Sequence, residues 1–138
     1  MNASELSEQI KTLVTSSEWG EAARLLAREW DEVSEFSVYH CDVPEQPDAL
    51  IKFKMTGYPF KLRRLWDEAK NDAEIMQLIM PRVASWSMLG AGGEPFPSAQ
   101  DCLSDIALLD ELEETMLMWV TRSFVNFWRL KLIQPRKN

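Results

Sequence analysis

The strongest constraint on the fold is an almost continuous apolar segment near the C-terminal end, from Met116 to Trp128. Four acidic residues within 110–114 precede it, and Arg122, Arg129 and Lys131 lie toward its far end. This polarity complements the dipole of a single helix, so we predict a helix that opens at Asp110 and continues through Trp128. Its apolar residues run almost all the way around such a helix: Met116, Leu117, Met118, Trp119, Val120, Phe124, Val125, Phe127, Trp128, Leu130, Leu132 and Ile133.

A helix that is apolar on every side has to be buried on every side, which a small domain can hardly achieve alone. We therefore expect one face of this helix to pack against its own domain and the other against a second chain, as a partner or through self-association. The candidate partner-binding residues are Trp119, Phe124, Phe127 and Trp128.

The remaining hydrophobic periodicity predicts an α+β fold, mainly helical, with one small antiparallel strand pair packed by helices. The 138 residues are expected to form a single domain. Within it we expect N-terminal helices at 1–33, the strand pair at 34–57, helices at 58–89, a loop at 90–97, C-terminal helices at 98–133 and a basic tail at 134–138. The two strands are placed at about 36–41 and 49–55.

Three residues predict helix boundaries. Asp72 is the expected N-cap of a helix whose apolar positions run from Ile75 to Trp86. Pro81 lies inside that pattern and should kink the helix or end it early. Ser98 is expected to cap a short helix through Leu103.

The charge of the chain excludes several classes of partner. It carries 15 basic and 22 acidic residues, a net charge of −7, so neither nucleic acid nor an anionic membrane surface attracts it in general. The charge falls in blocks: −8 in 1–48, +4 in 49–71, −8 in 72–114 and +5 in 115–138. Alternating blocks suit solvated helix faces, self-association or docking on another protein. No apolar run reaches the length of a membrane span and no secretory leader is recognisable, so we expect a cytoplasmic protein without membrane contact.

The sequence offers no combination of residues typical of an enzyme. His40 is the single histidine and neighbours Cys41 on a predicted strand, where adjacent side chains point to opposite faces. These two residues and Cys102 lack metal-ligand spacing. The glycines of 90–93 are followed by Glu94 and a proline, whereas a phosphate-binding loop leads directly into a helix. We expect no catalytic activity, no cofactor and no metal.

One segment resembles a known family. A helical region leads to Trp86 and then to the loop Gly93-Glu94-Pro95-Phe96-Pro97-Ser98, followed by short helices and an acidic-to-apolar helix. This pattern, over about 50 residues, is similar to the tail assembly chaperones of long-tailed (siphovirus-like) bacteriophages. The resemblance implies binding of the helical tape-measure protein, recruitment of tail tube subunits, and a longer form that arises by ribosomal frameshifting near the end of the gene.

Two alternatives belong to other classes. The acidic blocks at 1–48 and 72–114 would suit a small regulator that inhibits a nucleic-acid enzyme with acidic helix faces, although the basic blocks do not. The third hypothesis is an adaptor protein unrelated to phages. Genomic position separates them, because a chaperone gene lies between the tube gene and a very long helical gene.

Overall fold

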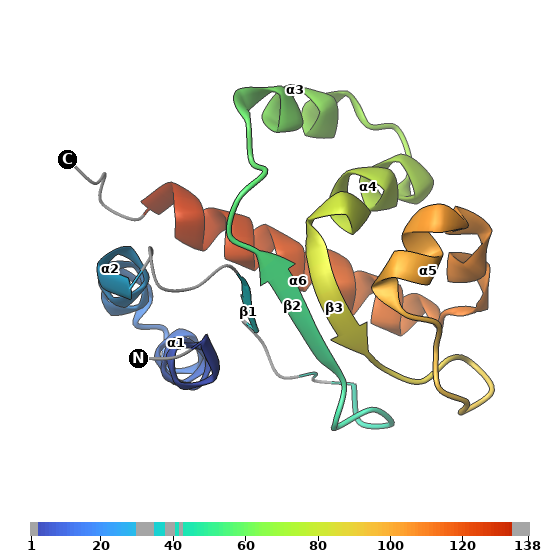
Figure 1. Ribbon diagram of the computed structural model, residues 1–138, viewed down its shortest axis with the longest axis horizontal. Helices are drawn as coiled ribbons and strands as arrows, with labels where there is room; N and C mark the ends of the chain where they lie inside the picture. The colour runs from blue at the N-terminus through green and yellow to red at the C-terminus, as the bar shows by residue number, and fades with distance from the viewer. Residues whose placement is uncertain (1–2, 30–34, 38–40, 42, 134–138) are drawn as a thin grey trace.

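The computed structural model describes residues 3–29, 35–37, 41 and 43–133 of the chain. It is mainly helical with a small antiparallel sheet, which confirms the predicted α+β class (Figure 1). The elements in chain order are α1 (Ala3–Thr15), α2 (Trp19–Glu29), β1 (Glu35–Ser37), β2 (Leu50–Lys54), α3 (Phe60–Glu68), α4 (Asp72–Ile79), the 3₁₀ helix η2 (Met80–Arg82), β3 (Val83–Ser87), α5 (Ala99–Ser104), the 3₁₀ helix η3 (Ile106–Glu111) and α6 (Glu114–Ile133).

The sheet contains the expected strand pair and a third strand that the sequence did not reveal. β1 and β2 pair antiparallel with Phe36 opposite Phe53, while residues 38–40 of the predicted first strand lie outside the described residues. β3 pairs antiparallel with the other edge of β2, where Ile51 lies opposite Trp86.

Strand β3 corrects the prediction that residues 75–86 are helical. Pro81 acts as expected, because α4 ends at Ile79 and a 3₁₀ turn follows. At Val83 the backbone is already in the extended conformation (φ −84°, ψ 121°). Pro81 has no N–H for the helical ladder and its ring obstructs the preceding turn, so the helix stops there. Val83 and Trp86 then satisfy their backbone groups on the free edge of β2, a tertiary contact that no local periodicity encodes.

Helix α6 crosses behind β2 and β3, and the other helices surround it (Figure 1). Its buried face carries Met116, Trp119, Val120, Phe124, Phe127 and Leu130. Opposite them, Ile51 and Phe53 of β2 are fully buried. The ring of Phe53 lies 5.6 Å from that of Phe124 and 5.3 Å from that of Phe127, centroid to centroid. Each buried aromatic side chain contributes about 2–3 kcal/mol to the stability of the folded state. The contact between α6 and β2 is therefore the centre of the hydrophobic core.

The helix ends agree with the sequence only in part. The Ser98 side chain accepts a hydrogen bond from the Asp101 N–H (3.2 Å) and caps α5, as predicted. The cap of α4 is Asn71, whose Oδ1 accepts from the Glu74 N–H (2.9 Å), not Asp72, which is the first helical residue. Both side chains are competent caps, and only the backbone path distinguishes them.

Helix α6 starts at Glu114, later than the predicted Asp110. Residues 106–111 form η3, and Leu112 behind it is extended (φ −92°, ψ 136°) and buried. Leu112 thus joins the core from an extended segment between η3 and α6.

The turn between α1 and α2 has a defined left-handed residue. Ser17 has φ 61° and follows the end of α1. The Glu18 N–H donates to the Leu13 carbonyl (2.8 Å) and the Ser17 N–H donates to the Val14 carbonyl (3.0 Å). This is the paired hydrogen-bond pattern of a Schellman C-cap, whose left-handed position is usually a glycine.

Candidate functional site

The predicted partner-binding residues of α6 lie mostly inside the protein. Phe124 and Phe127 are fully buried, Trp119 is 1% exposed and Trp128 is half-buried. Trp128 packs edge-on against Trp66 of α3, with 5.5 Å between ring centroids. The structure therefore places Trp119, Phe124 and Phe127 in the core of this chain and leaves Trp128 partly accessible. Strand β2 and helices α2, α3 and α4 contact α6.

The exposed apolar residues of α6 lie on the opposite side. Met118 is 59% exposed and Val125 is 42% exposed, and Arg122 between them is also exposed. We call Met118, Arg122 and Val125 the α6 stripe, because their spacing of four and three residues places them along one helical face. The sequence contains the signal for this face, since these positions lie opposite the aromatic positions that reach the core.

A groove adjoins the α6 stripe where helix α4 begins. Its lining consists of Asp72, Glu114, Leu117, Met118, Thr121 and Arg122, and its volume is about 300 Å³. Leu117 and Thr121 are half-buried in its wall, and the Thr121 hydroxyl donates to the Leu117 carbonyl (3.1 Å). The charged groups in its lining are the carboxylates of Asp72 and Glu114 and the guanidinium of Arg122. Such a surface fits the apolar side chains of another helix better than a compact polar ligand.

The residues that carry the family resemblance form one structural unit. The Trp86 indole N–H donates to the Pro97 carbonyl (2.8 Å), and its ring lies 6.0 Å from that of Phe96. Between them the chain makes a tight turn, in which the Gly90 N–H donates to the Glu94 carbonyl (2.7 Å). Gly93 has φ 80°, a conformation that favours glycine. The tryptophan and the Gly/Pro loop are therefore partners in space.

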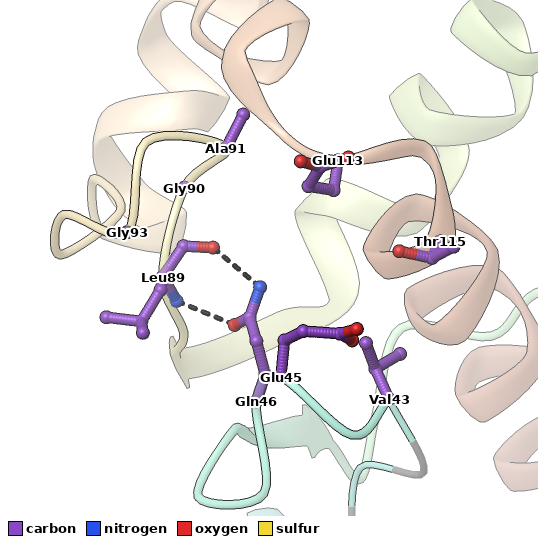
Figure 2. Close-up of a pocket in the computed structure, with 9 residues that line it drawn as sticks. All are labelled: Val43, Glu45, Gln46, Leu89, Gly90, Ala91, Gly93, Glu113 and Thr115. Atoms are coloured by element: carbon purple, nitrogen blue, oxygen red, sulfur yellow. Dashed lines mark hydrogen bonds between the residues drawn. The ribbon is translucent and has the colours of Figure 1, made fainter.

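A second cavity, of about 380 Å³, lies beside this turn (Figure 2). It is lined by Val43, Glu45, Gln46, Leu89, Gly90, Ala91, Gly93, Glu113 and Thr115. The Gln46 amide closes one wall: it accepts from the Leu89 N–H (2.8 Å) and donates to the Leu89 carbonyl (2.9 Å) (Figure 2). The Gln46 side chain thus makes the two backbone hydrogen bonds that a neighbouring strand would otherwise make with Leu89. It links the 43–49 loop to the turn. Sequence reasoning missed it, because a glutamine between two prolines looks like an ordinary loop residue.

Two carboxylates are among the described residues that line this cavity. Its titratable residues are Glu45 and Glu113, and its lining includes no histidine, cysteine or lysine. Cys102 is buried elsewhere, where desolvation, and after it the carboxylates of Asp101 and Asp105, raise the pKa of its thiol to about 11. A thiol with a raised pKa is a poor nucleophile at neutral pH. His40 lies outside the described residues.

Two further observations concern the described part of the chain. It contains no cluster of three or more histidine, cysteine, aspartate or glutamate residues able to hold a metal ion. None of its helices combines the length and apolar character needed to cross a bilayer.

Comparison with known proteins gave no match to any protein-family model, to curated proteins or to solved structures.

Proposed function

We propose that this chain is a tail assembly chaperone of a long-tailed bacteriophage, which binds the tape-measure protein and assists assembly of the tail tube. The observation that carries the proposal is the α6 stripe with its adjoining groove, where Met118 and Val125 expose apolar side chains on an acidic protein. The contact of Trp86 with the Phe96-Pro97 loop supports it, because the residues that resemble the family act together.

The physical role follows from the shape and chemistry of this surface. Met118 and Val125 offer apolar contact, and Glu114 and Arg122 at the groove can pair with charges that flank the apolar face of a bound helix. A single surface of this size gives weak, reversible binding. Many copies along one long helix would shield it from aggregation and still release it when tube subunits arrive.

The proposal includes the absence of intrinsic catalysis and a cytoplasmic location, that of the host cell if a phage encodes the chain. It includes no binding of nucleic acid, no membrane contact and no cofactor. The alternative is a small acidic regulator or adaptor, for example an inhibitor of a nucleic-acid enzyme. The exposed acidic residues of α5 and η3 favour this alternative, since they could imitate a phosphate backbone.

Co-expression with a tape-measure fragment tests the proposal. Wild-type protein should co-purify with the fragment, and the double variant Met118→Glu, Val125→Glu should lose at least about tenfold of this binding, since two desolvated carboxylates oppose docking. Gln77→Glu, an exposed charge substitution on α4, is the matched control and should bind as wild type. Failure of the wild-type protein to retain the fragment, with retention of a nucleic-acid enzyme instead, would favour the regulator.

A further inference from the structure

Phe60, the first residue of α3, is 87% exposed, more than any other large hydrophobic side chain that the structure describes. The outward face of the helix also carries Arg64, and Lys61 is exposed beside it. The neighbouring Arg63 is 3.8 Å from the Asp67 carboxylate and 5.9 Å from the Trp128 ring, so it is committed within the chain. Phe60, Lys61 and Arg64 thus form a basic surface around an exposed aromatic ring, which we call the α3 face.

A surface of opposite charge lies on α5 and η3. Leu103 is 50% exposed and Ile106 is 38% exposed. Exposed acidic residues lie on or between the same two short helices: Asp101, Asp105, Asp110 and Glu111. We call this set the α5 patch. Apolar residues with a rim of one charge are typical of a protein-binding surface, and the rim selects a basic partner.

The α3 face and the α5 patch do not cover each other within one chain. Helix α3 packs against α4, whereas α5 packs against β3, η2 and η3. The two helices lie at different parts of the periphery, α3 at the top of the view and α5 at the right (Figure 1). Both surfaces stay exposed, and they match in chemistry: an aromatic ring with two cations on one, two aliphatic side chains with four carboxylates on the other.

We propose that a second copy of this chain occupies the α5 patch, with Phe60 of one copy on Leu103 and Ile106 of the next. Lys61 and Arg64 then face Asp101 and Asp105 across the contact, and the charge pairing sets its direction. The two surfaces differ, so the contact is heterologous and each copy has one of each. Copies add head to tail, and the number of copies is not limited to two.

This inference does not depend on the tape-measure proposal, because it uses different residues. The contact uses none of the residues of the α6 stripe, so each added copy brings one further stripe to the assembly.

The test uses two variants of the full chain that each lose one surface. The face variant carries Phe60→Ser and Arg64→Ser, and the patch variant carries Leu103→Ser and Asp105→Ser. All four positions are exposed, so both should melt at the wild-type temperature. Met118→Ser on the α6 stripe is the matched control, because it removes an apolar side chain of similar exposure from another surface.

Sedimentation velocity should show wild-type protein growing beyond a dimer as its concentration rises, and shrinking at about 1 M salt, where charges are screened beyond about 3 Å. Each variant alone should be monomeric, with association at least about thirtyfold weaker than wild type. An equimolar mixture of the two should form a 1:1 dimer and nothing larger, because one intact face meets one intact patch. Met118→Ser should associate as wild type.

Three outcomes would overturn the proposal. The first is a wild-type protein that stays monomeric at high micromolar concentration in low salt. The second is a face variant or patch variant that, while folded, still self-associates as wild type does, which would place the contact elsewhere. A mixture that stays monomeric when the wild type assembles would equally contradict the head-to-tail pairing.

Discussion

Replacement of Gln46 tests how much this side chain stabilises the packing of the 43–49 loop against the turn that contains Leu89. Gln46 is 7% exposed and makes two hydrogen bonds to the backbone of Leu89, at 2.8 and 2.9 Å. A net hydrogen bond contributes about 1 kcal/mol, so Gln46→Ala should lower the free energy of unfolding by about 2 kcal/mol. Leu89 is 39% exposed, so water can hydrogen-bond to its N–H and carbonyl groups in the variant. The loss of stability should therefore stay below that of leaving two buried polar groups without a partner.

The assay is urea unfolding with Gln100→Ala as the matched control. Gln100 is exposed and donates one hydrogen bond, to the Ala84 carbonyl (2.8 Å), so its loss should cost no more than about 1 kcal/mol. Gln46→Glu keeps the acceptor but cannot donate to the Leu89 carbonyl, and it should be at least as destabilised as Gln46→Ala. The reasoning is refuted if Gln46→Ala unfolds within about 0.5 kcal/mol of wild type, the range of ordinary surface substitutions.

Three further predictions concern single residues. Ser17→Gly should raise the free energy of unfolding by about 0.5–1 kcal/mol, measured by urea unfolding, because glycine adopts φ 61° without strain; no gain would argue against the Schellman turn. Cys102 should resist iodoacetamide at pH 8 until the protein is denatured, while labelling of the native protein at the same rate as a denatured control would contradict its burial. Burial lowers the pKa of Lys131 to about 8. Between pH 8 and about 10.5 the unfolded chain therefore keeps the Lys131 proton while the folded chain loses it, so the free energy of unfolding rises with pH. After allowance for partial solvent exposure, wild type should gain about 1–2 kcal/mol relative to Lys131→Met over that range. A pH-independent difference between the two proteins would contradict this.

The sequence predicts the parts of the fold that depend on local chemistry. Pro81 ends α4 and Ser98 caps α5, because a missing N–H and a hydroxyl acceptor act within a few residues of the chain. The pairing of Val83–Ser87 with β2 could not be read in the same way. These five residues fit the helical period that precedes them, and only the free edge of β2 makes them a strand.

The candidate site shows the same division. The sequence indicates more apolar surface on α6 than one small domain can bury, and the structure exposes Met118 and Val125 there. The residues named from the sequence as partner-binding, Trp119, Phe124 and Phe127, are buried in the core of the chain. Phe53, Tyr58 and Trp66 supply ring contacts to Phe124 and Phe127 from distant positions in the sequence. No local pattern of α6 shows these tertiary contacts.

Photo-crosslinking from the α6 stripe tests the central claim, that this surface holds the tape-measure protein, most directly. A photoreactive amino acid replaces Met118 in one sample and Gln77, an exposed residue of α4, in the other, and each protein is co-expressed with a tape-measure fragment before irradiation. We expect Met118 to give a crosslink to the fragment, identified by mass spectrometry, and Gln77 to give little or none. A fragment that co-purifies yet crosslinks no better from Met118 than from Gln77 would contradict it.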